Sequence, residues 1–168
     1  LNSMKIWLKI SLTAIAALSC VSWVQAEGWG SGTELPSTLE GFALEGEVPE
    51  MEGKVTLVDF WASWCAPCKA AFPEMEKLYQ NFKDEGFQIV AVSVDQKANQ
   101  MQRFLDKQKP SFATPHDAGQ QLVKAAAISV MPSSFLVDRK GVIRFAHEGW
   151  HGKKSAENLT HQIPGNDR

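Results

Sequence analysis

Cysteine is scarce in this chain, and long apolar runs are lacking. Its 168 residues include only Cys20, Cys65 and Cys68. Three cysteines are too few for a framework of several structural disulfides, and the ligands are too few for a structural zinc site, which takes four. The apolar stretch at residues 10–24 is shorter than the roughly 20 residues that a membrane-spanning helix needs.

The sequence also lacks an excess of charge of one sign. Its formal net charge is −2, so nothing in the composition indicates a nucleic-acid partner. Hydrophobic residues make up 44% of the chain and charged residues 21%, which is enough to build one globular core without suggesting disorder. No internal repeat is visible.

The first 26 residues have the features of a secretory signal peptide. Lys5 and Lys9 give a basic start, an apolar stretch follows, and residues 24–26 offer small side chains for cleavage. We therefore expect export to the periplasm and removal of residues 1–26. The alternative is a lipoprotein anchored through Cys20, but the residue three before it is alanine, where lipoprotein signals usually carry leucine.

The rest of the chain divides into a leader, one domain and a tail. Residues 27–38, rich in glycine, serine and threonine, predict a flexible leader; residues 39–163 form the domain, and residues 164–168 a polar tail. The turn signal Glu45-Gly46 predicts a short β-hairpin over residues 42–48. Further apolar and periodic segments alternate along the domain. They predict strands at 55–61, 88–95, around 135 and at 142–146, and helices at 66–83, 98–108, 119–127 and 156–163.

Cys65 and Cys68 lie where the strand at 55–61 gives way to a helix. Backbone N–H groups and the dipole at a helix N-terminus stabilise a thiolate, which is the reactive form of cysteine. Cys68 follows one helical turn later, on the same face and within disulfide reach. One sulfur can therefore attack a substrate while the other resolves the product.

The run Val58 to Lys69, VDFWASWCAPCK, resembles the active-site segment of the thioredoxin superfamily. Phe72-Pro73-Glu74 is similar to its extracytoplasmic TlpA/ResA-like branch, and the resemblance covers roughly residues 42–149. It implies a thioredoxin-like α/β fold: a central mixed sheet flanked by helices, with an N-terminal β-hairpin and a central helical insertion. It also implies a protein thiol:disulfide oxidoreductase that needs no cofactor and no metal ion.

The same resemblance assigns a substrate-binding surface. It implies that Pro132 is cis and shapes a loop beside the reactive cysteine, and that the backbone of Met131 binds an extended substrate segment by strand addition. Trp64, next to Cys65, and Pro67 complete the expected surface.

Thiol–disulfide exchange needs a group that takes the proton from the buried resolving thiol. Asp59 lies six residues before Cys65, where thioredoxins carry a buried acid, and burial should raise its pKa. ResA-like proteins often carry a glutamate three residues after the second cysteine, but this chain has Ala71 there. Ala91 occupies the place of a lysine in thioredoxins. We predict that Asp59 is catalytic; the alternative is a core polar group satisfied by hydrogen bonds.

The resemblance implies a monomeric periplasmic enzyme that reduces disulfides in exported proteins, with apocytochrome c as a candidate. A membrane electron donor of the DsbD or CcdA kind would then restore the dithiol. The direction is open, because potentials in the superfamily run from about −270 to about −120 mV. The Ala66-Pro67 pair lacks the histidine of strong oxidants, which favours reduction over a dithiol oxidant.

Two other functions would use some of the same residues. A Sco-like copper module could use both cysteines with His147 or His151, although Sco-like proteins space their cysteines one residue further apart. A peroxidase would carry threonine three residues before its reactive cysteine, and this chain has Ala62.

Overall fold

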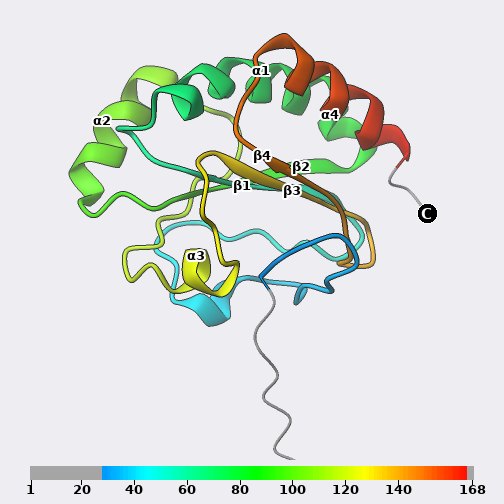
Figure 1. Cartoon of the computed structure of the whole chain (residues 1–168), viewed down its shortest axis with the longest axis horizontal. Coiled ribbons are helices and arrows are strands. Elements are labelled where there is room, and N and C mark those ends of the chain that lie inside the picture. Colours follow the sequence, from blue (N-terminus) through cyan, green and yellow to red (C-terminus); the bar gives the residue numbers. More distant parts are fainter. Residues whose placement is uncertain (1–27, 166–168) are drawn as a thin grey trace, which may run out of the picture.

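A four-stranded mixed sheet runs through the middle of the molecule (Figure 1). The computed structural model describes residues 28–165, so the predicted signal peptide, Cys20 and the end of the tail lie outside it. The strand order is β2-β1-β3-β4, with β2 parallel to β1 and the other pairs antiparallel. The strands are β1 (Val55–Trp61), β2 (Phe87–Ser93), β3 (Ser133–Val137) and β4 (Ile143–Glu148). This sheet confirms the predicted α/β class.

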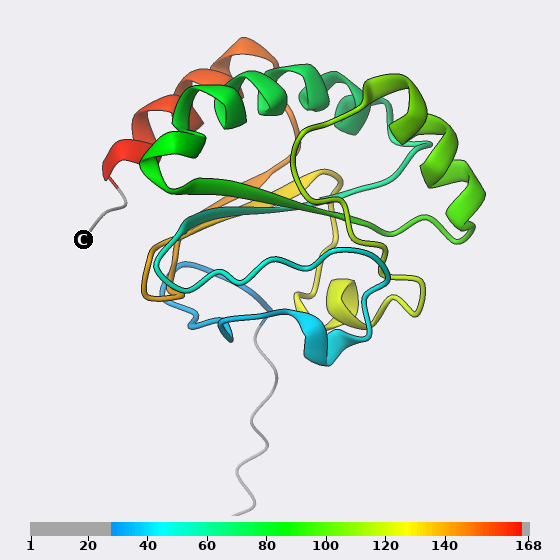
Figure 2. The ribbon, with the colours of Figure 1, turned by 180° about the vertical axis from the view of Figure 1, so that it is seen from behind.

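Three helices cover one face of the sheet, while a short helix and the N-terminal segment cover the other (Figures 1 and 2). The first layer consists of α1 (Ala66–Phe82), α2 (Ala98–Gln108) and α4 (Lys153–Gly165). The second contains α3 (Gln121–Ala125) and the 3-10 helix η1 (Glu40–Phe42); a further 3-10 turn, η2 (Lys83–Glu85), follows α1. The predicted helical insertion is confirmed, because α2 and α3 fill the connection from β2 to β3. Within residues 28–165, no helix is long and apolar enough to cross a membrane.

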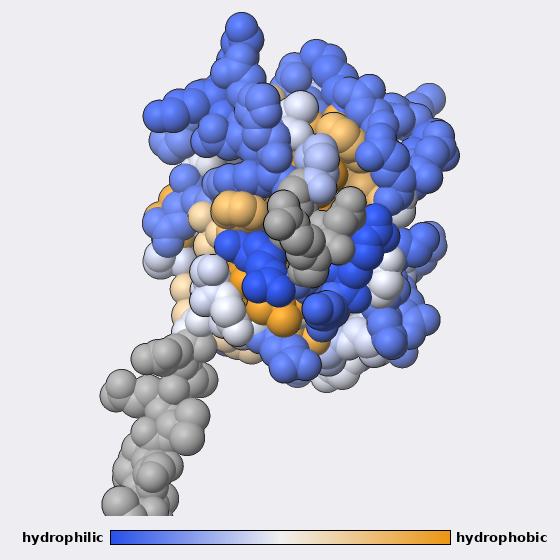
Figure 3. Space-filling model, turned by 90° about the vertical axis from the view of Figure 1, so that its right-hand side faces the viewer, coloured by the Kyte–Doolittle hydropathy of each residue, from blue (hydrophilic) through white to orange (hydrophobic). Residues whose placement is uncertain are grey.

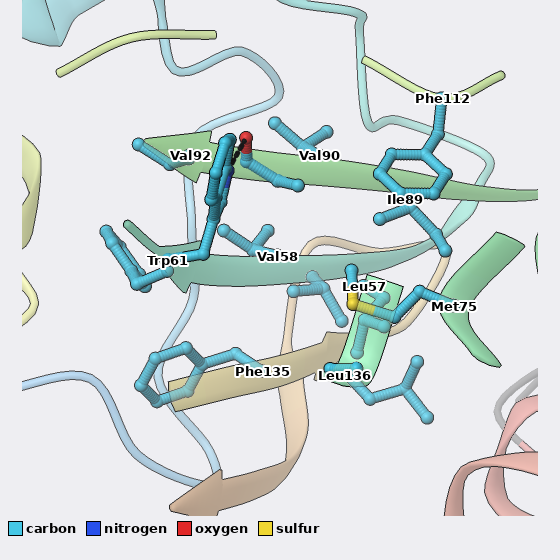
Figure 4. Close-up of a cluster of buried hydrophobic side chains, with 14 of the residues drawn as sticks. Leu57, Val58, Trp61, Met75, Ile89, Val90, Val92, Phe112, Phe135 and Leu136 are labelled. Atoms are coloured by element: carbon cyan, nitrogen blue, oxygen red, sulfur yellow. Dashed lines mark hydrogen bonds between the residues drawn. The ribbon is translucent and has the colours of Figure 1, made fainter. Parts of the chain in front are cut away.

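Every side chain of β1 is buried, and alternate residues face opposite layers. Leu57 lies under Met75 of α1 (Figure 4). Trp61 packs against Phe72 of α1 and Phe104 of α2, with ring centroids 4.7 and 5.0 Å apart. These contacts fix the end of β1 beneath the start of α1, which is where the two cysteines lie.

The segment predicted to be a flexible leader packs against the other face of the sheet. Trp29 contacts Phe60 and Phe135 edge to face, with ring centroids 5.7 and 5.5 Å away. The backbone N–H of Trp29 donates a hydrogen bond to the carbonyl of Ala126. The backbone of Gly28 lies so close to Ala127 that a Cβ added at Gly28 would be 2.5 Å from the Cβ of Ala127. The glycine and serine content suggested flexibility, but the half-buried ring of Trp29 holds this segment on the core.

The predicted β-hairpin over residues 42–48 does not form, and that prediction was wrong. Residues 40–42 form η1, and Glu45 makes an isolated bridge with His116, in which each N–H donates to the other residue's carbonyl. Gly46 has the positive φ of the expected turn, 100°. Glu45, just before this turn, pairs with the loop before α3 instead of with the residues that follow the turn.

The two ends of the sheet differ in what they carry. The connection from β1 to α1 lies at the end where α2 and α3 are found, and the β3–β4 turn lies at the other end (Figure 1). Figure 3 shows the side of the molecule at that second end, where hydrophilic residues cover most of the surface and apolar areas are small.

Candidate active site

Cys65 and Cys68 form a disulfide across the first turn of α1. The S–S distance is 2.08 Å and the two Cα atoms are 5.3 Å apart. Cys65 is the N-cap of the helix, and its Sγ accepts a hydrogen bond from the backbone N–H of Cys68 at 3.2 Å. Pro67 fits in the first turn, where a helix needs no donor from that residue. When the disulfide is reduced, the same N–H groups would favour a thiolate on Cys65.

The disulfide is covered by its neighbours, but the surface around it is open. Cys65 and Cys68 are 5% and 1% exposed, whereas Trp64 is 64% exposed and Pro67 also faces solvent. Trp64 and Met131 line the same hollow, of about 550 Å³. The structure thus brings two of the predicted substrate-binding residues to one concave surface beside the cysteines.

Asp59 lies in the middle of β1, on the face that α1 covers. It is 2% exposed, and Ser134 of β3 donates its hydroxyl proton to Asp59 Oδ1 at 2.6 Å. Burial disfavours the charged carboxylate and raises the pKa of Asp59 to about 7; the hydrogen bond from Ser134 offsets part of the rise. A carboxyl group that titrates near neutral pH can both take up and return a proton.

The two departures from the family pattern leave Asp59 in an apolar setting. Ala91 pairs with Asp59 in the β1–β2 ladder, and Ala71 is buried on α1. Neither residue can supply a charge. Desolvation therefore dominates the acidity of Asp59.

The Met131–Pro132 peptide bond is cis, as the family resemblance implied. Pro132 is held at its carbonyl by the N–H of Gly149 at 2.7 Å, and Ser133 donates its hydroxyl proton to the carbonyl of Val130 at 2.8 Å. Among the described residues, the N–H and C=O of Met131 have no hydrogen-bonding partner. These groups are free to pair with an extended chain.

Sequence reasoning missed Asp95, which fixes the loop before the cysteines. Asp95 is fully buried, and its carboxylate accepts hydrogen bonds from the N–H and the hydroxyl of Ser63 at 2.9 and 2.7 Å. Ser93 donates a third, at 2.9 Å. A signal was available: an acid directly follows the apolar run of β2, whose carboxyl end lies beside that of the parallel strand β1.

His147, one of the histidines of the copper hypothesis, is engaged in a contact between β4 and α4. His147, on β4, forms a hydrogen bond through Nε2 with Gln162 of α4 at 2.7 Å. Over residues 28–165, no three His, Cys, Asp or Glu side chains come together as a group that could hold a metal ion.

Comparison with known proteins agrees with this geometry. The sequence matches the Redoxin family model over residues 39–160, which is most of the chain. The chain belongs to the Redoxin family. Within it, the chain is 34% identical to the thiol-disulfide oxidoreductase ResA of Halalkalibacterium halodurans over 125 residues, or 74% of this chain and 70% of that one. ResA of Bacillus anthracis is 30% identical over 136 residues, covering 79% of this chain and 78% of that one.

Solved structures place this Redoxin family member among the thioredoxin-like folds. A protein from Chlorobium tepidum, described as a DsbE thiol:disulfide interchange protein, shares 32% identity with a TM-score of 0.75, covering 83% of this chain and 99% of that one. StoA from Bacillus subtilis shares 26% identity with a TM-score of 0.61, covering 80% of this chain and 98% of that one. The chain is a thiol–disulfide oxidoreductase of the ResA-like kind, as the CxxC segment had predicted.

Proposed function

We propose that this protein acts outside the cytoplasm and reduces disulfide bonds in exported proteins, apocytochrome c among them. The observation that carries the proposal is the Cys65–Cys68 disulfide at the N-terminus of α1, where the first sulfur accepts a backbone hydrogen bond. Export follows from the signal-like residues 1–26. The protein works as a monomer, and a membrane donor of the DsbD or CcdA kind returns electrons to it.

The cycle begins with the reduced pair. The thiolate of Cys65 attacks one sulfur of the partner's disulfide; that bond breaks, a mixed disulfide forms, and the released partner sulfur takes a proton. The thiol of Cys68 then gives its proton to the carboxylate of Asp59 and attacks the sulfur of Cys65. The mixed disulfide breaks, the second partner sulfur leaves and takes the proton, and two electrons have moved to the partner.

Substrate binding is assigned to four residues around this pair. The free N–H and C=O of Met131 bind an extended segment of the partner by strand addition, and the cis Pro132 shapes the loop that contains Met131. Trp64 and Pro67 form the exposed surface over which the partner's disulfide approaches Cys65.

Trapping tests the proposal. Cys68→Ala leaves the attacking sulfur without its resolving partner, so mixed disulfides should accumulate in the periplasm and be released by dithiothreitol. Cys65→Ala is the matched control and should trap none. Apocytochromes in the trapped set would support cytochrome maturation, and a broad set of exported proteins would support general reduction. An empty trap with both variants would contradict the proposal.

Direction is tested separately by equilibrating the purified pair with glutathione. A potential near the thioredoxin end of the range, about −270 mV, is expected of a reductant. A value near −120 mV would make the protein a dithiol oxidant instead.

A further inference from the structure

Two hollows flank the exposed ring of Trp64. One, of about 550 Å³, runs towards Met131 and is lined by Lys124 and three glutamines. The other, of about 500 Å³, lies between Ser63 and α2. Trp64 and Gln100 line both hollows. Both hollows therefore lie beside the residue that precedes Cys65.

The charge of these hollows differs from that of the whole protein. The chain has 19 acidic and 17 basic residues, yet no aspartate or glutamate lines either hollow. Four cations do, and all four are exposed: Lys69, Arg103, Lys107 and Lys124. We call these four residues the basic rim.

The basic rim carries charges that the described protein does not neutralise. Over residues 28–165, none of its four side chains has an ion-pair or hydrogen-bond partner. Some cations elsewhere are paired, since Lys77 lies 2.7 Å from Glu74 and Lys153 lies 3.4 Å from Glu157, whereas Lys54 and Lys140 resemble the rim in having no partner among the described residues. The rim thus presents its full charge to whatever approaches the disulfide.

Two acids lie near the rim and offset only part of its four positive charges. The carboxylate of Asp95 is buried below Ser63 and is occupied by hydroxyl and N–H donors. Asp106 is on α2 but accepts a hydrogen bond from Gln102, and it lines neither hollow. The approach to Cys65 is therefore electropositive on a protein whose net charge is negative.

From this arrangement we propose that the protein selects partner polypeptides that carry acidic side chains next to their disulfide. This inference rests on the proposed disulfide exchange and names its substrate class. Opposite charges around two docking surfaces raise the rate of encounter by about 10 to 1,000-fold at low ionic strength, and salt screens the effect. The basic rim would raise the rate at which the protein meets its partner. The backbone of Met131 would then bind the partner segment, and the cysteines would react with its disulfide.

The test uses three synthetic peptides that differ only beside one intramolecular disulfide, with glutamate, glutamine or lysine at the flanking positions. The reduced protein is mixed with each, and the second-order rate constant is measured at low and at high salt. Each rate is divided by that of dithiothreitol with the same peptide, which removes differences in the reactivity of the disulfides themselves.

We expect the glutamate peptide to react about tenfold faster than the glutamine peptide at low salt, and the lysine peptide to react slowest. High salt should remove most of the difference. The double variant Arg103→Glu with Lys107→Glu should reverse the order. Its matched control, Lys54→Glu with Lys140→Glu, makes the same change in net charge at exposed positions before β1 and in the β3–β4 turn, and it should keep the order.

The outcomes separate this inference from the function on which it rests. If no peptide oxidises the reduced protein, disulfide exchange itself is contradicted. If all three react at the same normalised rate, or if the control variant reverses the order as strongly as the rim variant, only the acidic-partner inference fails.

Discussion

Two buried aspartates at opposite ends of β3 have opposite acidities. Asp59 lies opposite Ser134 near the start of the strand and is 2% exposed; its pKa is raised to about 7 by burial. Asp138 directly follows the last residue of β3 and is 1% exposed. Equal solvent exposure therefore does not give equal acidity.

The difference comes from depth and from donors, because Asp59 lies deep in the sheet whereas Asp138 lies near the surface beside the partly exposed Arg144 and has more donors. Burial alone would raise the pKa of Asp138 too, but the N–H groups of Val142 and Lys140 and the guanidinium of Arg144 outweigh burial, and the pKa lies below its ordinary value. Asp59 has one donor among the described residues, a neutral hydroxyl. One end of the strand thus holds a fixed negative charge, and the other holds a proton that can be exchanged near neutral pH.

The largest expected effect is on the pH dependence of stability, measured by urea unfolding of the oxidised protein. Below about pH 4 both the folded and the unfolded chain keep the proton on Asp59. Between pH 4 and 7 only the unfolded chain releases it, so stability falls as pH rises, by up to about 4 kcal/mol in total. Asp59→Asn should remove this slope and be more stable than the wild type at pH 8. Equal slopes in the two proteins would show that Asp59 is ionised when folded.

The next effect is on catalysis. Asp59→Asn cannot accept the proton of Cys68, so disulfide exchange at pH 7 should slow by about 100-fold, while the reduction potential changes little. The rate is followed from pH 6 to 9 with a protein disulfide as substrate. Asp138→Asn, the matched buried aspartate, should exchange at the wild-type rate. An unchanged rate for Asp59→Asn across this range would remove Asp59 from the mechanism.

Asp138→Asn should instead lower stability, by about 2 kcal/mol at pH 7, because charge-assisted hydrogen bonds to two backbone N–H groups and to Arg144 are weakened. The pKa of Asp138 is lowered in the folded state, so its stabilisation is present above the pKa of the unfolded chain and is lost as pH falls through the folded value. The cost of the substitution should therefore shrink in acid. If Asp138→Asn lowers the free energy of unfolding by the same amount at all pH values down to strong acid, the negative charge of Asp138 contributes nothing to stability.

The smallest effect is expected for Ser134→Ala, which removes the hydroxyl donor from Asp59. Stability should fall by about 1 kcal/mol. Because the hydrogen bond lowers the pKa of Asp59, its loss should shift the pH profile of exchange upwards. Ser134→Thr keeps the hydroxyl and should restore the wild-type profile. A downward shift in Ser134→Ala would contradict the geometry.

Local sequence was enough to predict the strands, the helices and the acid in β1. Asp59 could be found because a charged residue interrupts a short apolar run, and the alternation of β1 placed it on the face covered by α1. The segment with Cys65 and Cys68 resembles the thioredoxin superfamily, and that resemblance predicted the cis bond at Pro132.

What could not be predicted depends on contacts between residues far apart in the chain. The hairpin at residues 42–48 failed since Glu45 pairs with His116, 71 residues away. Asp95 binds Ser63 from just beyond the end of β2, so its part in holding the active-site loop appears only after β1 and β2 are paired.

The contact of Trp29 with Phe60 and Phe135 determines how far the N-terminus can be shortened in a fragment that still folds. Similarity to the Redoxin family begins at residue 39, and an expression fragment started there would leave both phenylalanine rings uncovered on that side. Losing a half-buried indole costs on the order of 2–3 kcal/mol of burial. The region that matches the family is thus shorter than the folded domain, which includes Trp29. A fragment meant to stay folded should begin no later than residue 28.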